Sequence, residues 1–334
     1  MLVFLLRHTT IVQISSDLYG LRERCAVDGG AWVWYDGAMQ IQIALPTNWD
    51  ADQYALLDSG ADYKLERFGG VVLARPEPQA IWGRHLDAAA WDAADATFSR
   101  DAEAPGAHWT PRHELPETWP ITWRGLTFLA RLTPFKHTGV FPEQAAHWEW
   151  IADRVANANR SVRVLNLFGY TGAASLVAAQ AGAQVTHVDA SPKVIEWARD
   201  SQAASDMQEA PIRWITDDAL KFVRREARRD ARYDLIIMDP PAFGRGAKGE
   251  IWKFETSLPQ LLEACRDILS PRPIGILINS YSIRASALLL ANLLDELVTA
   301  HRVTGTVTAG ELVLPEHDST RLLSTAIYAR WEAK

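Results

Sequence analysis

The chain has 334 residues, of which 48% are hydrophobic and 22% are charged, values that are ordinary for a globular protein. This length allows one large α/β domain with a smaller companion, and no apolar run is long enough to form a transmembrane helix. Two cysteines, Cys25 and Cys265, are too few for a disulfide framework or a cysteine-rich metal site. The sequence therefore predicts a cytoplasmic protein without a bound metal.

The net charge of −7 argues against broad, non-specific binding to nucleic acid, because such binding depends on neutralising phosphates. The charge is also uneven. Residues 1–130 hold 10 Lys+Arg and 17 Asp+Glu, whereas residues 131–334 hold 24 of each. Any nucleic-acid surface must therefore be a local patch, and we expect it on the second part of the chain.

Residues 1–50 are predicted to be an N-terminal extension. The opening Met1–Leu6 is apolar but lacks a basic start and a small-residue cleavage site, so we expect no signal peptide. Further on, Trp32–Tyr35 favours a strand, and Asp36-Gly37 favours a turn before Met39–Leu45.

Residues 51–134 predict a small β-rich domain, in which polar and apolar residues alternate between glycine turns. The predicted antiparallel strands are Tyr54–Leu57, Tyr63–Phe68 and Val71–Ala74. Residues 84–118 are rich in Ala, Asp and Pro and predict a loop or short helices. Ile121–Thr133 predicts a further hairpin that turns at Arg124-Gly125.

Residues 135–334 predict an α/β domain, because near-continuous apolar strands alternate with helices, as in a parallel sheet covered on both faces. The last two strands have no helix between them, so we expect a hairpin and an antiparallel final strand. The seven predicted strands are Val162–Phe168, Gln184–Val188, Ile212–Ile215, Tyr233–Met238, Ile274–Ile278, Val303–Val307 and Ser324–Trp331. The predicted helices are Glu143–Ala156, 172–181, 192–204, 217–229, 256–269 and 285–299.

A candidate cofactor site follows the first strand of this domain, where the loop Gly169-Tyr-Thr-Gly172 precedes a helix. Glycines let the backbone turn sharply, and a helix N-terminus offers free N–H groups. The second strand ends at Asp189, where a carboxylate can accept both hydroxyls of a ribose. The third ends in Asp217-Asp218. We expect Asp217 to cap the following helix and Asp218 to reach an adenine amine.

A dinucleotide site is the alternative for this loop, but it usually requires the pattern G-x-G-x-x-G. The sequence instead offers G-x-x-G, which suits an amino-acid tail better than a diphosphate.

A candidate catalytic site follows the fourth strand, at Asp239-Pro-Pro-Ala-Phe243. Prolines fix the backbone and leave carbonyl groups without local amide partners. Asp239 and the Pro240 carbonyl can therefore accept hydrogen bonds from an amine, and Phe243 can stack on a planar base. A rigid strand-to-loop turn with a core Phe is the alternative interpretation.

These motifs resemble the bacterial 23S ribosomal RNA large-subunit methyltransferases, a group with cytosine-C5 and guanine methylating members. The resemblance covers about residues 53–334. The matching segments are His137–Gln144, Asn166–Gly172, Val188–Ser191, Glu196–Ala198, Asp218 and Asp239–Phe243. The resemblance implies the Rossmann-like fold of class I methyltransferases, with S-adenosylmethionine as cofactor and RNA as substrate.

The resemblance also implies roles for single residues. It places Phe168, Gly169 and Gly172 at the methionine end of the cofactor, with Thr138 and Gln144 near it. It implies that Asp189 binds the ribose and Asp218 the adenine. It also implies that Asp239, Pro240 and Phe243 face the substrate. The remaining cofactor-binding positions that it implies are Asn166, Ala190 and Ser191, with Asp239 also near the cofactor.

One departure concerns the methylated atom. Cytosine-C5 methylation needs a thiolate nucleophile, and relatives with that chemistry carry cysteines after the fifth strand. This chain has Asn279-Ser-Tyr-Ser282 there, and Cys265 lies mid-helix, where a buried structural thiol is expected. Methylation of a ring or exocyclic nitrogen is therefore the better hypothesis.

Two segments are candidates for an RNA surface. The helix face Lys221–Arg232 is strongly basic, but a solvated outer face is its simpler interpretation. The loop Gly244–Gly249 lies beside the predicted reaction centre and is followed by Trp252 and Lys253. Arg245, Lys248 and Trp252 could thus hold an unstacked base, although a lid over any substrate is an equal alternative.

The leading functional hypothesis is methylation of a nitrogen of an RNA base, in ribosomal RNA, by a monomer or a homodimer. The rivals are a methyltransferase acting on a protein side chain or small molecule, and a cofactor-binding protein without turnover.

Overall fold

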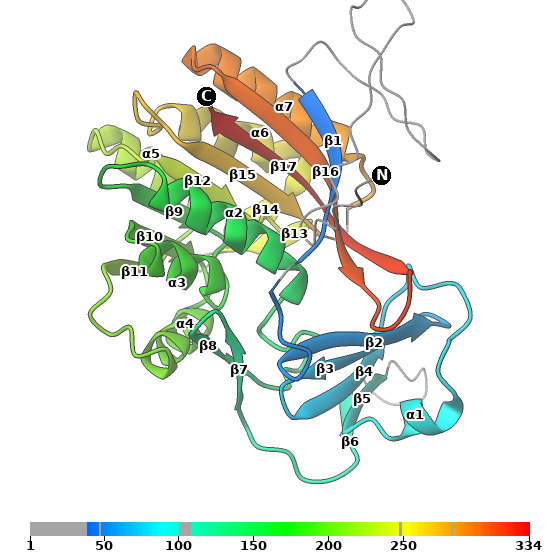
Figure 1. Ribbon diagram of the computed structural model, residues 1–334. Coiled ribbons are helices and arrows are strands. Elements are labelled where there is room, and N and C mark those ends of the chain that lie inside the picture. Colours follow the sequence, from blue (N-terminus) through cyan, green and yellow to red (C-terminus); the bar gives the residue numbers. More distant parts are fainter. Residues whose placement is uncertain (1–38, 47, 100–107, 247–248, 282) are drawn as a thin grey trace, which may run out of the picture.

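The computed structural model describes residues 39–46, 48–99, 108–246, 249–281 and 283–334 (Figure 1). The sequence predictions for Met1–Leu6, Cys25, Trp32–Tyr35, Asp36-Gly37 and Lys248 lie outside these ranges. Among the described helices, none is long and apolar enough to cross a membrane.

An eight-stranded sheet forms the centre of the larger part, in the order β1-β16-β17-β15-β12-β9-β10-β11. Neighbouring strands from β11 to β15 pair in parallel, whereas β17 is antiparallel to both β15 and β16. The mostly parallel sheet and the antiparallel last strand are thus confirmed. The strands are β1 (Met39–Ala44), β9 (Arg163–Leu167), β10 (Gln184–Asp189), β11 (Ile212–Thr216), β12 (Leu235–Met238), β15 (Gly275–Ser280), β16 (Gly305–Pro315) and β17 (Leu322–Ala333).

The predicted count of seven strands is wrong because β1 adds an eighth at the sheet edge, parallel to β16 (Figure 1). Gln42 pairs with Gly310, and a Cβ on Gly310 would lie 1.6 Å from the Gln42 carbonyl oxygen. Only glycine permits this close approach of the two strands. The two strands lie far apart in the sequence, so no local sequence pattern predicts that they pair.

Six helices cover the two faces of this sheet. On one side α2 packs on α3, and α4 lies beside them; on the other side α5, α6 and α7 pack together (Figure 1). Side chains of Ser191, Asp218 and Ser286 cap three of these helices at their N-termini. The helices are α2 (Ala145–Ala156), α3 (Ala173–Gln180), α4 (Pro192–Ala204), α5 (Ala219–Arg228), α6 (Phe254–Arg266) and α7 (Ala287–His301).

A second, five-stranded sheet of order β2-β3-β4-β5-β6 forms the smaller part. The antiparallel β2-β3-β4 meander is as predicted. The prediction of loop or helix for residues 84–118 is wrong in part, because two four-residue strands lie there beside the short helix α1 (Ala88–Asp92). Strands this short carry too few residues to show alternation. The strands are β2 (Tyr54–Gly60), β3 (Tyr63–Phe68), β4 (Val71–Pro76), β5 (Ala96–Ser99) and β6 (His108–Pro111).

The hairpin of β7 (Trp119–Trp123) and β8 (Leu126–Ala130) turns at Arg124 and Gly125, as predicted, with both residues at positive φ. It packs on α4, where Trp197 Nε1 donates to the Leu129 carbonyl at 2.7 Å. One hydrophobic cluster runs from the small sheet through this hairpin to α2 and β9. The division at residues 50 and 134 stays a prediction.

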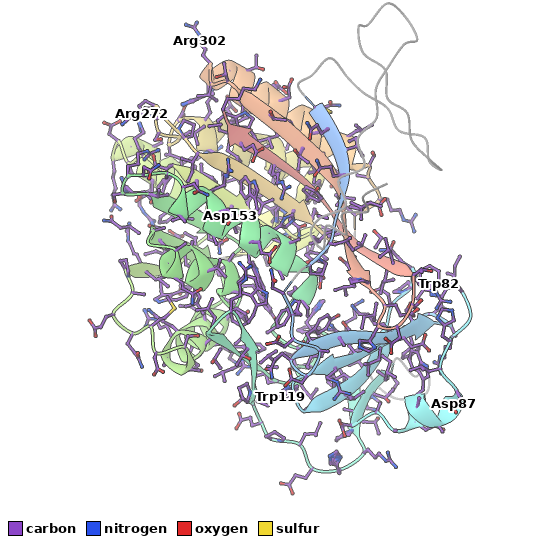
Figure 2. The ribbon with its side chains drawn as sticks, viewed as in Figure 1. Trp82, Asp87, Trp119, Asp153, Arg272 and Arg302 are labelled. Carbon is purple, nitrogen blue, oxygen red and sulfur yellow. The ribbon has the colours of Figure 1, made fainter. Side chains whose placement is uncertain are left out.

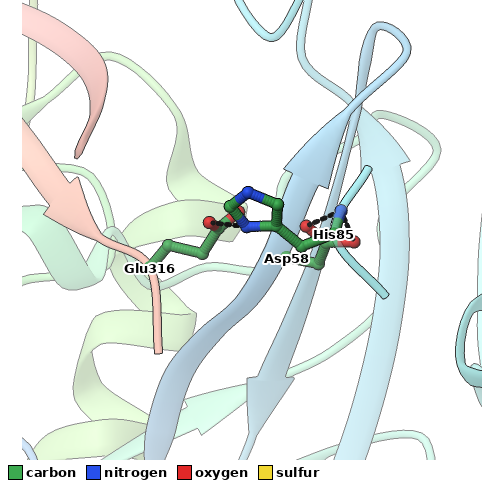
Figure 3. Close-up of side chains that lie close together, drawn as sticks. All are labelled: Asp58, His85 and Glu316. Carbon is green, nitrogen blue, oxygen red and sulfur yellow. Dashed lines mark hydrogen bonds and ion pairs between the residues drawn. The ribbon is translucent and has the colours of Figure 1, made fainter. Parts of the chain in front are cut away.

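The end of the β16–β17 hairpin reaches the small sheet, where Asp58, His85 and Glu316 lie together (Figures 1 and 3). Glu316 accepts from Ser59 N at 2.7 Å and is hydrogen bonded to His85 Nδ1 at 3.0 Å. Arg321 also donates to Glu316, and its guanidinium lies 5.5 Å from the Trp82 ring. Figure 2 labels Trp82 at this end of the small sheet. This cluster joins the two parts of the molecule.

Asp58 is fully buried and accepts hydrogen bonds from the backbone nitrogens of Ser59, His85 and Leu86 and from Trp91 Nε1, at 2.8–3.1 Å. Burial alone would raise the pKa of Asp58, but these hydrogen bonds outweigh it and lower the pKa. The carboxylate is therefore the anchor of the loop between β4 and α1.

We predict that Asp58→Ala lowers the free energy of unfolding by about 3 kcal/mol, because it leaves several buried donors without an acceptor. Asp92→Ala, an exposed position in the same region, should change it by less than about 0.5 kcal/mol. Urea denaturation of both variants measures the difference. Equal stability of the two variants would contradict the anchoring role.

Candidate functional site

A cavity of about 1240 Å³ lies over the carboxyl ends of β9, β10 and β12 and extends to the small sheet. Parallel strands bring their last residues to one edge, which is why ligands bind there in open α/β sheets. Its walls come from the loops after these strands, from β3 and β4, and from β16 and β17. The cavity therefore joins residues that are widely separated in sequence.

The loop after β9 contributes Phe168 and Tyr170, which both line the cavity and both have positive φ. Gly172 ends the loop at φ +82°, where a Cβ would lie 2.9 Å from the Trp214 ring. The sharp turn thus requires glycine at this position. Gly169 and Gly172 do not themselves line the cavity, so these predicted cofactor residues shape the loop.

Asn166 is 3% exposed and lies beneath this loop instead of facing the cavity, contrary to its predicted role as a cofactor ligand. Its Nδ2 donates to Ser175 Oγ at 2.9 Å, and Ser175 Oγ is hydrogen bonded to His187 Nδ1 at 2.9 Å. Burial lowers the pKa of His187 to about 3, so the ring is neutral. This buried network supports the loop from below.

Asp189 lines the cavity at the end of β10, with Ala190 and Ser191 beside it. Its carboxylate accepts from Tyr170 N at 3.0 Å and from Ser191 N at 2.9 Å. Burial raises the pKa of Asp189, and the backbone hydrogen bonds oppose this shift. A fixed acceptor thus stands in the wall of the cavity.

Both Asp217 and Asp218 line the cavity. The prediction that Asp217 caps the following helix is wrong. Asp218 is the N-cap of α5 and accepts from Lys221 N at 2.9 Å. Asp217 instead accepts from Arg225, nearly two turns into the helix, at 2.5 Å. Adjacent carboxylates at a helix start cannot be ranked as caps from sequence alone.

The segment from Thr138 to Gln144 leads into α2. Thr138 is fully buried, does not line the cavity, and its Oγ1 has no hydrogen-bond partner among the described residues. Gln144 Nε2 donates to Asp239 Oδ2 at 3.4 Å and to Tyr281 Oη at 3.1 Å. Gln144 therefore supports the candidate catalytic carboxyl, whereas the structure leaves Thr138 outside the cavity.

Asp239 lies at the end of β12, where it lines the cavity with Pro240. Its Oδ1 accepts from Asn279 Nδ2 at 3.1 Å. Burial raises the pKa of Asp239 to about 7; the Asn279 hydrogen bond opposes this shift, and the nearby Glu143 adds to it. A carboxyl that titrates near neutral pH can exchange a proton with a bound ligand.

Phe243 is 57% exposed and does not line the cavity, so the structure does not bring it to Asp239 as predicted. It begins β13 (Phe243–Arg245), which pairs with β14 (Ile251–Lys253). Trp252 is buried, with its ring 4.8 Å from Phe168 and its Nε1 donating to the Pro241 carbonyl. Trp252 and Arg245 both line the cavity, so two residues of the predicted patch lie at the candidate site, whereas Lys248 lies outside the described residues.

Sequence reasoning missed the wall that the small sheet contributes. Lys64 and Arg75 line the cavity, and Arg75 holds the buried Glu66 at 2.5 and 3.0 Å. Burial alone would raise the pKa of Glu66, but the charges of Arg75 and Lys64 and the hydrogen bonds from Arg75 and Tyr54 together outweigh it and lower the pKa to about 2. Tyr170, Glu143 and Tyr281 were also missed. Each stands within a segment that the sequence singled out: Tyr170 in the Gly169–Gly172 loop, Glu143 before Gln144, and Tyr281 after the fifth predicted strand.

The sheet order and the cavity over the strand ends define the class of protein, an α/β enzyme of the Rossmann-like methyltransferase type. The family model of S-adenosylmethionine-dependent methyltransferases matches residues 83–298. The chain belongs to this family, and S-adenosylmethionine is its cofactor. The half-buried acceptor Asp189 and the sharply turned loop beside it fit a nucleoside with an amino-acid tail.

Solved structures and curated proteins agree with this assignment. A SAM-dependent methyltransferase from Agrobacterium tumefaciens is 44% identical and has a TM-score of 0.84, over 93% of this chain and 100% of that chain. A methyltransferase complexed with SAH has a TM-score of 0.59 at 18% identity, over 84% of this chain and 75% of that one, and so shares the fold.

Among curated proteins, ribosomal RNA large subunit methyltransferase K/L of Shewanella frigidimarina is 32% identical over 149 residues. The match covers 44% of this chain and 20% of the relative, so the chain spans about a fifth of that protein's length.

We predict that Asp239→Asn raises the free energy of unfolding at pH 8. The folded carboxyl has a pKa of about 7, whereas an unfolded aspartate has one near 3.9. Between these values the folded state binds a proton that the unfolded chain has lost, so stability falls as the pH rises. The variant lacks this effect, so its free energy of unfolding should exceed that of wild type by about 1–3 kcal/mol at pH 8. The two values should converge near pH 4.

Urea denaturation at both pH values tests this. Asp153→Asn, on the exposed face of α2 (Figure 2), serves as the control and should show no such pH-dependent difference. A variant no more stable than wild type at pH 8 would show that Asp239 is ionised at little cost.

Proposed function

We propose that this enzyme transfers the methyl group of S-adenosylmethionine to a nitrogen of an RNA base, in cytoplasmic ribosomal RNA. The observation that carries the proposal is the carboxyl of Asp239 beside the Pro240 carbonyl, both lining the cavity that contains the cofactor loop. Two acceptors at one strand end can hold an amine by both of its hydrogens. The curated relatives are named ribosomal RNA large subunit methyltransferases, which supports an RNA base as the source of this amine.

The cofactor roles are part of this proposal. Asp189 would accept the two ribose hydroxyls, since its carboxylate is held from behind by two backbone donors. Asp218 would reach the adenine amine with the carboxylate oxygen that is not used for capping. Phe168 would lie against the methionine end, with Trp252 supporting its ring.

The proposed reaction needs little acid–base chemistry before the transfer. The nitrogen lone pair attacks the methyl carbon, the bond from carbon to sulfur breaks, and the sulfonium becomes a neutral thioether. The main contribution of the protein is the in-line placement of these atoms. The methylated nitrogen then loses a proton, for which the Asp239 carboxylate is the nearest described acceptor at the end of β12.

A nitrogen target fits the available nucleophiles better than a carbon target. Activation of a cytosine ring requires a thiolate within reach of the base. Cys265 is fully buried within α6, and burial raises the pKa of its thiol, so it remains protonated. The end of β15 presents Asn279 and Ser280 beside Asp239 and Pro240 instead.

The β13–β14 hairpin is the proposed RNA surface. Its register places Phe243 opposite Lys253 and Arg245 opposite Ile251, and all four side chains are exposed. Directly opposite residues share a face of a β-ribbon. Two cations and an aromatic ring on one face suit phosphates and unstacked bases next to the target nucleotide.

We predict that the wild-type enzyme transfers label from methyl-labelled S-adenosylmethionine to ribosomal RNA taken from cells that lack this gene. Asp239→Ala should lower that rate by about 100-fold or more, because it removes both the acceptor of the amine and the proton acceptor. Nucleoside mass spectrometry after digestion locates the methylated atom. Calorimetric titration with S-adenosylhomocysteine should show that the variant still binds the cofactor product.

Label in protein or in small molecules with unlabelled RNA would overturn the RNA assignment. A methyl group on a base carbon would overturn the nitrogen assignment alone. Full activity of Asp239→Ala would show that Asp239 neither holds the amine nor accepts its proton.

A further inference from the structure

Glu143 is a further carboxyl in the cavity, in addition to Asp189, Asp218 and Asp239, and it has no part in the contacts proposed so far. It lies in the short turn Pro142–Gln144 before α2, is 3% exposed, and lines the cavity together with Asp239. Burial of a carboxylate is costly unless other groups compensate or the group holds a proton. The burial of Glu143 therefore needs a compensating interaction or a functional role.

The charged surroundings of Glu143 come mainly from the small sheet. Lys64 and Arg75 are the cations near it, and Glu66 is a further anion. These cations already have partners, because Lys64 lies 3.4 Å from Glu66 and Arg75 binds Glu66 through two nitrogens. Glu143 is thus not required to neutralise them.

On its other side Glu143 lies near Tyr281 and Asp239. Burial and the charge of Glu143 raise the pKa of the Tyr281 phenol, whose oxygen accepts from Gln144 Nε2 at 3.1 Å. The same Gln144 amide donates to Asp239 Oδ2 at 3.4 Å. Gln144 and Tyr281 therefore lie between two carboxyls that line one cavity.

We propose that Glu143 is a second catalytic residue, which contacts the acceptor nitrogen opposite Asp239 and shares with Asp239 the proton released after methyl transfer. This inference rests on the proposed transfer to a nitrogen and deepens it.

The proton balance of the step is as follows. The acceptor nitrogen forms a bond to the methyl carbon as the bond to sulfur breaks, which leaves the nitrogen with one proton too many. Asp239 takes that proton and becomes neutral. The proton then leaves Asp239 through the cavity, to solvent directly or by way of the Glu143 carboxylate, which lines the same cavity.

Electrostatics support a coupled pair. Burial raises the pKa of Glu143, and the charges of Lys64 and Arg75 oppose the shift. The charge of Glu143 in turn raises the pKa of Asp239. Two carboxyls that interact in this way release their protons in separate steps, so the pair can hold one proton near neutral pH. The phenols of Tyr54 and Tyr281 also face Glu143, and burial raises the pKa of each.

The test uses Glu143→Gln, which keeps the size of the side chain but cannot titrate. We expect kcat at pH 8 on ribosomal RNA to fall by about tenfold or more. We also expect the acid limb of the pH–rate profile to move to lower pH by roughly 0.5 units or more, because the like charge near Asp239 is gone. Glu143→Asp should recover part of the rate.

Glu149→Gln is the matched control, since it makes the same chemical change on α2, the helix that follows Glu143, and lies outside the cavity. It should leave both the rate and the acid limb unchanged. A merely structural role for Glu143 would lower stability in Glu143→Gln without moving the acid limb.

A second readout does not need the RNA. Carbon-13 NMR of labelled aspartate side chains, with Asp239→Asn to assign the resonance, follows the titration of Asp239 directly. We expect its pKa to be lower in Glu143→Gln than in wild type. An unchanged pKa of Asp239 overturns the carboxyl pair whatever the substrate is.

The two proposals can fail separately. If wild type labels no RNA but the Asp239 pKa responds to Glu143→Gln, the RNA assignment fails and the coupled pair stands. If RNA is labelled and Glu143→Gln changes neither the rate nor the acid limb, the catalytic role of Glu143 is overturned and the proposed function stands.

Discussion

The burial of carboxyl groups at the ends of parallel strands is the constraint on which this site depends. A parallel sheet covered on both faces brings its strand ends to one edge, and β9, β10 and β12 present Phe168, Asp189 and Asp239 there. Removal of these carboxyls from water raises the pKa of both Asp189 and Asp239. The resulting cost in stability is compensated elsewhere, by the extensive apolar contacts of the two sheet faces.

The small sheet closes the cavity from the other side, and its position is fixed by polar contacts as well as by apolar packing. One continuous apolar cluster joins it to α2 and β9. The β16–β17 hairpin adds a second connection through Glu316, which contacts Ser59 and His85. Lys64 and Arg75 are thereby held in the cavity wall. One wall of the cavity is thus built by the part of the chain that has no cofactor loop.

The alternation of strands and helices after residue 135 was predictable because most of its strands are nearly continuous apolar runs, separated by segments long enough for a helix. The positions of Asp189 and Asp239 followed from it, since a strand end fixes where its last residue lies. The edge pairing of β1 with β16 was not predictable, because it depends on a close approach at Gly310 that only the assembled sheet reveals. The choice between Asp217 and Asp218 as helix cap and the burial of Trp252 depend on side-chain packing that local sequence does not encode.

The central claim is that one cavity holds the cofactor and the acceptor, with Asp239 at their meeting point. A crystal structure of the protein with S-adenosylhomocysteine tests it most directly. The account predicts the ribose at Asp189, the adenine near Asp218 and the thioether sulfur directed toward Asp239. A cofactor bound elsewhere, or with its sulfur directed away from Asp239, would contradict the account and remove the basis for the assigned roles.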